Sequence, residues 1–142
     1  MLRTETELNR IAYEIRGSGI DIHRHLGPGC FESAYFPCFA YELTKRKLEF
    51  RARVPLVLQY EDVVVPRAYE ADFIVEGSVL VELKAIERVA PVHLRQLQTY
   101  LRLSGCPLGL ILNFGADRMT DGIERRVNHF PDGTTPHTDS GH

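Results

Sequence analysis

Hydrophobic residues recur at two different spacings along the chain, and each spacing predicts one kind of element. In residues 5–26 and 32–47 the apolar side chains stand three or four positions apart, which predicts two amphipathic helices. Gly17 and Gly19 predict an interruption within the first helix. The GPG sequence at residues 27–29 predicts the break between the two helices.

From residue 50 the pattern changes to alternating polar and apolar positions with many β-branched side chains, which is typical of strands. The strands expected here are residues 54–60, 63–65, 69–75 and 79–84. Polar turns at residues 61–62 and 76–78 separate neighbouring strands, so we expect consecutive strands to pair antiparallel.

Helical spacing returns between Pro91 and Leu103, and a continuous apolar run from Leu108 to Asn113 then predicts a buried strand. The predicted order is helix, three or four strands, helix, strand, which is an α/β arrangement. Residues 128–142 are rich in Pro, Gly, Ser, Thr and Asp, so we expect a flexible tail there.

Composition is consistent with a globular α/β domain and argues against a membrane-spanning or secreted protein. The chain has 142 residues, of which 44% are hydrophobic and 25% are charged, as expected for one globular domain, here residues 1–127. No apolar stretch approaches the roughly 20 residues of a membrane-spanning helix. The N-terminal sequence has no hydrophobic signal-peptide core, so we expect a cytoplasmic protein.

Cysteine and charge limit the sites that the chain can carry. Three widely spaced cysteines without a CxxC pair argue against a disulfide framework, a zinc site or a four-thiolate iron–sulfur cluster. The net charge of -2 provides no overall attraction to nucleic acid. A short basic cluster predicts either a local phosphate-binding patch or a solvated helix end followed by the outer face of a strand. Its members are Lys45, Arg46, Lys47, Arg51 and Arg53.

The candidate chemistry lies on the two strands that flank residues 76–78. If these residues form a three-residue hairpin loop, counting outward from the loop places Asp72 directly across from Glu82. Their Cβ atoms are then about 5 Å apart on one face of the sheet. Strand alternation puts Lys84 on the same face as Glu82, whereas the side chain between them points into the core.

Two opposed carboxylates repel each other, and a purely structural hairpin would not favour that arrangement. A divalent cation such as Mg²⁺ would favour it, because this ion takes oxygen ligands from one or two carboxylates, water and substrate phosphate. A bound metal can activate water, and Lys84 can orient that water or stabilise the transition state. The alternative is an ordinary solvent-facing strand, but the apolar neighbours of Glu82 favour a buried one.

Polar residues on the predicted helices complete the candidate set. Glu32 lies in the first turn of the second helix, where a lone carboxylate commonly complements the helix dipole. Gln96 and Tyr100 are four positions apart on the third helix and share a face with His93. We expect His23, His25 and His93 to cap helices or to lie on the surface, with metal or phosphate binding as the alternative. No function is expected for the histidines of the tail, which are His129, His137 and His142.

Four short motifs occur in one order: GCFESAY (residues 29–35), ADFIV (71–75), VELKA (81–85) and QLQTY (96–100). In this order they resemble the GxxExxY protein family, and the resemblance extends over residues 8 to 127. That family is classed with the PD-(D/E)XK nuclease-like superfamily, and the motif set is similar to that of RecB-type nuclease domains.

The resemblance implies a restriction-endonuclease-like αβββαβ core, with a central mixed sheet flanked by helices. It implies that Asp72, Glu82 and Leu83 bind Mg²⁺ or Mn²⁺, and that Lys84 is the catalytic lysine. The implied catalytic set is Glu32, Asp72, Glu82, Lys84, Gln96 and Tyr100.

The implied function is a metal-dependent phosphodiesterase that acts on nucleic acid, with DNA as the expected substrate. The alternative is a nuclease fold that has become an inactive module for binding nucleic acid or protein. Glu70 departs from the family, in which we expect a basic residue; its carboxylate either faces away from the site or makes it more acidic. The sequence leaves open whether the chain forms a homodimer.

Overall fold

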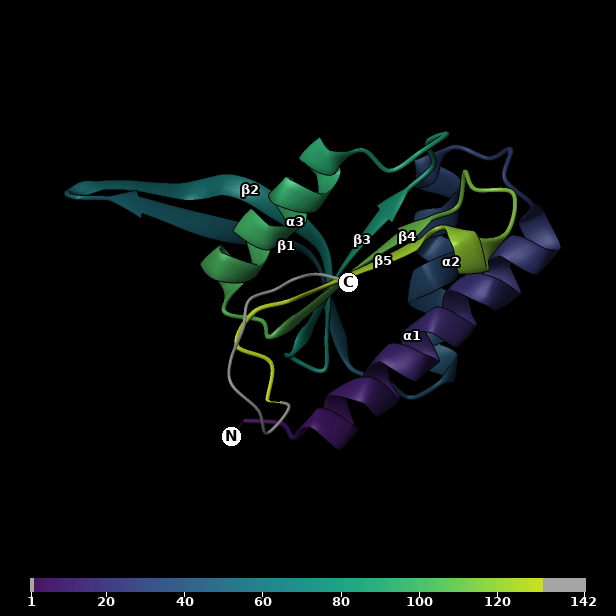
Figure 1. Cartoon of the computed structure of the whole chain (residues 1–142), viewed down its shortest axis with the longest axis horizontal. Coiled ribbons are helices and arrows are strands. Elements are labelled where there is room, and N and C mark those ends of the chain that lie inside the picture. The colour runs from purple at the N-terminus through teal and green to yellow at the C-terminus, as the bar shows by residue number, and fades with distance from the viewer. Residues whose placement is uncertain (1, 132–142) are drawn as a thin grey trace.

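In the computed structural model, which describes residues 2–131, five strands form one sheet in the order β1-β2-β3-β4-β5 (Figure 1). The elements are α1 (Glu5–Leu26), α2 (Glu32–Lys45), β1 (Phe50–Tyr60), β2 (Val63–Val75), β3 (Val79–Lys84), α3 (Pro91–Ser104), β4 (Leu108–Asn113), the 3₁₀ turn η1 (Met119–Asp121) and β5 (Ile123–Val127). β3 and β4 are parallel and the other neighbours are antiparallel. This mixed sheet confirms the predicted α/β fold class.

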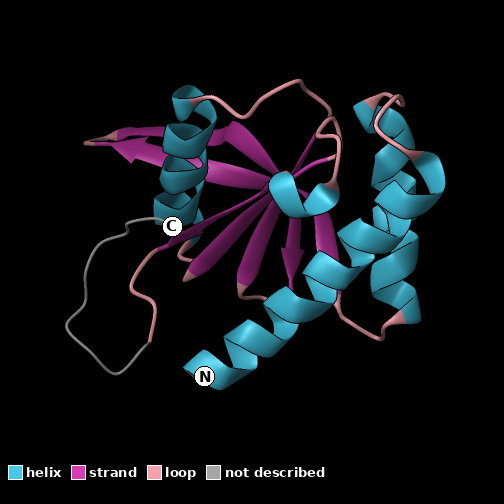
Figure 2. Cartoon of the chain, turned by 45° about the vertical axis from the view of Figure 1, so that its right-hand side comes forward, coloured by secondary structure: helices cyan, strands magenta, loops and turns pink. Residues whose placement is uncertain are grey.

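Helices lie on both faces of the sheet (Figure 2), and the sheet separates two hydrophobic cores. Helices α1 and α2 cover one face, where Phe39 packs edge-on against Phe73 at a ring-centroid distance of 4.9 Å. Helix α3 covers the opposite face, where Leu97 and Leu101 pack with Leu80 of β3. Among residues 2–131 no helix is both long and apolar enough to span a membrane.

Helix α1 is continuous, so the predicted interruption at Gly17 and Gly19 is wrong. Both glycines instead lie where the helix meets its neighbours. A Cβ atom on Gly19 would stand 3.2 Å from the Leu112 side chain, and one on Gly17 would stand 2.9 Å from the Arg46 guanidinium. Because glycine lacks this atom, the helix can approach the sheet and Arg46 closely.

Strands β1 and β2 are longer than predicted. The strands predicted at residues 63–65 and 69–75 are one strand, and β1 begins at Phe50 rather than at residue 54. The register of the two strands shifts at Val57, and Pro66 of β2 lies opposite this bulge. Proline is tolerated there because a bulge does not require its missing N–H for a regular ladder.

The C-terminal part of the fold was predicted only in part. The bounds of β4 match the predicted strand, but β5 was not predicted. Its sequence, IERRV, contains three charged residues and therefore has little of the apolar pattern that predicts a strand. Backbone pairing with β4 stabilises it as a strand. The expected flexible tail falls largely on residues 132–142, which lie outside the described part of the chain.

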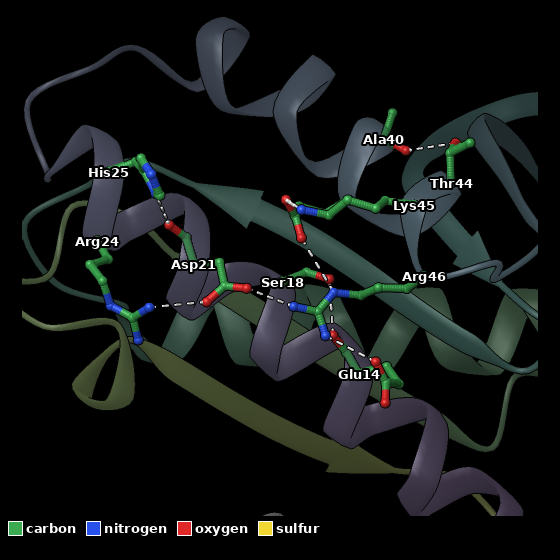
Figure 3. A network of polar contacts seen from close by, with 10 residues as sticks. Glu14, Ser18, Asp21, Arg24, His25, Ala40, Thr44, Lys45 and Arg46 are labelled. Atoms are coloured by element: carbon green, nitrogen blue, oxygen red, sulfur yellow. Dashed lines mark hydrogen bonds and ion pairs between the residues drawn. The ribbon is translucent and has the colours of Figure 1, made fainter.

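Two members of the basic cluster form ion pairs at the α1–α2 packing region, and one of them, Arg46, bridges the two helices (Figure 3). The Arg46 guanidinium lies 2.9 Å from a Glu14 carboxylate oxygen, 2.8 Å from one of Asp21 and 3.3 Å from one of Glu42. Lys45 pairs with the other Glu42 oxygen at 3.0 Å. Arg46 therefore joins the end of α2 to α1 and serves helix packing, whereas the Lys45 pair lies within α2.

Candidate functional site

The predicted hairpin register is confirmed up to the pair that precedes the two carboxylates. Regular pairs run outward from the turn to Phe73 and Val81, and Asp72 and Glu82 occupy the next position on each strand. Beyond Phe73 the ladder between β2 and β3 ends. The carboxylates therefore stand where the two strands separate.

The carboxylates replace the missing ladder hydrogen bonds. The N–H of Asp72 donates to Glu82 Oε2 at 2.8 Å, and the N–H of Leu83 donates to Asp72 Oδ2 at 2.9 Å. Each side chain is thus held by the backbone of the opposite strand. From residues 2–131 the other oxygens, Asp72 Oδ1 and Glu82 Oε1, receive no hydrogen bond, and neither is a fully buried atom. Both oxygens are therefore free to contact a cation.

Leu83 can contribute to this site only through its backbone. Its side chain is 1% exposed and packs in the α1–α2 core with Phe73. The N–H and C=O of one strand residue point to the same edge, so the carbonyl of Leu83 faces the gap in which its N–H meets Asp72. The next carbonyl, that of Lys84, points the other way and accepts the N–H of Phe114 at 2.7 Å.

The chemistry of this donor set fits a hard divalent cation. Among the described residues, no group of three or more His, Cys, Asp or Glu side chains is arranged to hold a metal. The gap instead offers two carboxylates and one backbone oxygen. Mg²⁺ is commonly bound by one or two carboxylates, with water and substrate phosphate filling its remaining positions. The residues present therefore fit Mg²⁺ or Mn²⁺.

Burial makes this carboxylate pair unfavourable without a cation. Burial, and after it the charge of Asp72, raise the pKa of Glu82 to about 8, although the N–H of Asp72 and the Lys84 ammonium oppose the shift. The pKa of Asp72 is also raised, mainly by burial. The charge of Glu70 adds to the rise in the pKa of Asp72, so the Glu70 carboxylate adds negative charge to the site, which is the second of the two predicted alternatives. A bound metal ion would favour the ionised form of both carboxyl groups and so oppose these rises in pKa.

Glu32 lies at the rim of the same site. Partial burial and the charge of Asp72 raise the pKa of Glu32, and Lys84 lowers it, so its carboxylate is within electrostatic reach of both residues. Much of the Glu32 side chain is nevertheless exposed. The structure therefore brings Glu32 to the predicted group from the start of α2.

Tyr35 fixes the loop that precedes Glu32. Its hydroxyl donates to the carbonyl of Gly27 and accepts the N–H of Cys30 at 3.1 Å. The ring is fully buried and stacks on Phe114, with 4.3 Å between the ring centroids. Tyr35 thus joins the glycine-rich loop to the end of β4.

Tyr35→Phe should lower the free energy of unfolding by about 1–2 kcal/mol, because Gly27 and Cys30 lose a hydrogen-bond partner in a buried setting. Urea denaturation followed by circular dichroism measures this change. Tyr41→Phe is the matched control, since Tyr41 is 65% exposed and its hydroxyl makes no hydrogen bond with residues 2–131. Equal stability of the two variants would contradict the assignment.

Helix α3 contributes Gln96 and Tyr100 as predicted. The Gln96 side-chain amide donates to the Tyr100 hydroxyl at 3.2 Å. Burial, and after it the charges of Glu82 and Asp72, raise the pKa of Tyr100 to about 12. Tyr100 is therefore a protonated hydroxyl held within electrostatic reach of the carboxylate pair.

Three of the described histidines, His23, His25 and His93, have structural contacts. His93 Nδ1 accepts the N–H of Ala90 at 2.8 Å and caps the start of α3. His23 Nε2 lies 2.8 Å from the carbonyl oxygen of Ala116. The helix-capping role predicted for His93 is confirmed, whereas His137 and His142 lie outside the described residues.

Arg53 is a site residue that the motif pattern did not identify. Its two neighbours on β1 pair with the two neighbours of Asp72 on β2, so Arg53 lies across from Asp72. Its φ of 52° falls in the left-handed region, which is uncommon for a residue with a long side chain. The guanidinium lies 4.1 Å from the centroid of the Phe36 ring and lowers the pKa of Asp72. In the sequence, membership of the basic cluster was the only feature that pointed to Arg53. The β1–β2 register distinguishes it from the other basic residues of that cluster, because it places Arg53 across from Asp72.

One family model matches the chain over residues 9–126, and its description is PD-(D/E)XK nuclease superfamily. The matched segment contains all of the residues discussed above, from Glu32 to Tyr100. No match was found among curated proteins or among solved structures.

Proposed function

Because the chain belongs to the PD-(D/E)XK nuclease superfamily, we propose that it is a metal-dependent phosphodiesterase that hydrolyses nucleic acid, with DNA as its substrate. The observation that carries this proposal is the interlocked carboxylate pair. Asp72 and Glu82 are each held by the backbone of the opposite strand, and each keeps one oxygen free. This arrangement is unfavourable in a purely structural hairpin and suits a divalent cation.

Asp72, Glu82 and the carbonyl of Leu83 would hold Mg²⁺ or Mn²⁺. When bound, this metal polarises a phosphoryl oxygen and lowers the pKa of a bound water. Lys84 lies on the same face of β3 as Glu82, and its charge opposes the rise in the pKa values of both carboxyl groups. The same ammonium would orient the attacking water and stabilise the negative charge that develops on the phosphate.

The remaining residues would place the substrate and the water. Glu32 at the rim would accept a hydrogen bond from the attacking water. Tyr100 would donate its hydroxyl hydrogen to a phosphate oxygen, since its raised pKa keeps it protonated. Gln96 acts through Tyr100 as a positioning residue, because its amide donates to the Tyr100 hydroxyl.

Arg53 would bind a substrate phosphate beside the metal. Among the described residues it forms no ion pair or hydrogen bond, and the Phe36 ring supports its guanidinium. Arg53→Gln should therefore raise KM by about tenfold while kcat changes little, because the contact forms in both ground and transition states. Arg51→Gln is the control, since Arg51 is an exposed arginine on the same strand. Equal KM values for the two variants would contradict this role.

The proposal is tested by incubating purified protein with labelled single-stranded DNA, duplex DNA and matched RNA. We expect cleavage of DNA in Mg²⁺ or Mn²⁺ and none in EDTA. Cleavage that persists in EDTA would exclude the metal mechanism. Metal binding without cleavage of any substrate would identify the inactive binding module instead.

A further inference from the structure

The outer part of the β1–β2 hairpin, residues 57–69, extends beyond α3 as a two-stranded arm (Figure 1). Six of the twelve large hydrophobic side chains that are exposed in the described chain belong to this arm. They are Val57, Tyr60, Val63, Val64, Val65 and Tyr69. Exposed apolar side chains of the protein are therefore concentrated on one short ribbon.

The register of the arm collects apolar residues on one of its faces. Leu58 pairs with Val65 and Tyr60 pairs with Val63. Paired residues of an antiparallel ladder point to the same face, and positions two apart along a strand share that face. These four side chains therefore form one apolar face, hereafter the arm face. The reverse face carries the pair of Gln59 and Val64.

Three of the four side chains of the arm face are exposed, and the fourth, Leu58, is half-buried at the base of the arm. Tyr60 is 66% exposed, Val63 is 56% exposed and β3 pairs with β2 only from Phe73 onward. A two-stranded ribbon without further packing is only marginally stable in water. Contiguous exposed apolar surface on a soluble protein commonly marks an interaction site. The arm face thus requires a partner surface of similar chemistry.

Charge on the arm favours a second copy of the same chain. The tip carries the acidic residues Glu61 and Asp62, and the bulge at the base carries Arg67. None of the three side chains forms an ion pair within residues 2–131. If two arms pack antiparallel about a two-fold axis near Leu58, the acidic tip of one copy lies beside Arg67 of the other.

We propose that the arm face binds the arm face of a second copy in this antiparallel, two-fold arrangement. The acidic tip disfavours nucleic acid as the occupant, because phosphate would be repelled. The buried area would total roughly 1,000 Å², near the lower limit for a specific interface, so the dimer should be weak. Dimerisation through the arm would not depend on catalysis.

Sedimentation velocity of the full chain tests this interface. At about 100 μM, a concentration that populates a complex with a micromolar Kd, wild type should sediment as a dimer. Tyr60→Thr combined with Val63→Thr should give a monomer, and threonine keeps the strand propensity of the arm. Gln59→Thr combined with Val64→Thr alters the reverse face of the same ribbon and should leave the dimer intact. Circular dichroism verifies that both variants fold.

The charge pairing gives an independent result. Arg67→Glu should raise the dimer Kd at least threefold, and adding Glu61→Arg and Asp62→Arg to it should restore the wild-type value. A wild-type chain that remains monomeric at about 100 μM would overturn the proposal. A dimer that both threonine variants weaken equally would also overturn it. Arm variants that bind DNA more weakly while wild type is monomeric would assign the arm to nucleic acid instead.

Discussion

Asp72→Asn and Lys84→Ala are each expected to reduce the rate of metal-dependent DNA cleavage by about 10³-fold or more. Asp72→Asn keeps a side-chain oxygen that can accept the N–H of Leu83, but it removes the negative charge next to the proposed metal. Lys84→Ala removes the cation that would stabilise the developing charge on phosphate. Initial rates on labelled DNA, measured at saturating Mg²⁺, give both values.

Metal binding distinguishes the two variants. Asp72→Asn should weaken Mn²⁺ binding at least tenfold in isothermal titration calorimetry, whereas Lys84→Ala should bind Mn²⁺ at least as well as wild type. Glu87→Ala is the matched control, because Glu87 is exposed and lies three residues beyond Lys84. Wild-type cleavage rates in both Asp72→Asn and Lys84→Ala would refute the proposed site.

Glu82→Gln should stabilise the metal-free protein at pH 8 by about 2–4 kcal/mol, although it removes a proposed metal ligand. Burial raises the pKa of Glu82 to about 8 in the folded protein, against 4.5 as the ordinary value. Between these pH values the unfolded chain releases a proton that the folded chain retains. Stability of the wild type therefore falls as pH rises from 4.5 to 8, and it changes little from this cause above 8.

Glutamine cannot ionise, so the stability difference between Glu82→Gln and wild type should vanish near pH 4 and be largest at pH 8 and above. Urea denaturation in EDTA at several pH values measures it. Saturating Mg²⁺ should then stabilise wild type and leave the variant almost unchanged, because only a folded state that binds the ion is stabilised. A variant that is less stable than wild type at pH 8 in EDTA would contradict this account.

Several features followed from local sequence alone. A three-residue turn at residues 76–78 and the period-two alternation of strands together determine which residues face each other across a hairpin. That local geometry predicted the apposition of Asp72 and Glu82, and the structure has it. The bounds of β4 were also predicted, because an uninterrupted apolar run in a strand that is buried on both faces is visible in the sequence. The catalytic roles of these residues remain predictions.

Other features depended on contacts between residues far apart in the chain. Strand register is one such feature, because the sequence of a single strand does not contain it. Register decides the position of Arg53 across from Asp72, the bulge opposite Pro66 and the pairing of β5 with β4. In the sequence Arg46 does not differ from the other members of the basic cluster. In the folded chain it is distinguished by its ion pairs with Glu14 and Asp21 of α1.

The sequence by itself therefore determined which residues carry the candidate chemistry and how the central hairpin places Asp72 and Glu82. Only the tertiary structure decided which of the neighbouring charges belong to that site. Separate elements have to pack before an arginine or a glutamate acquires its partners, and packing also sets the burial that raises the pKa of Glu82 to about 8.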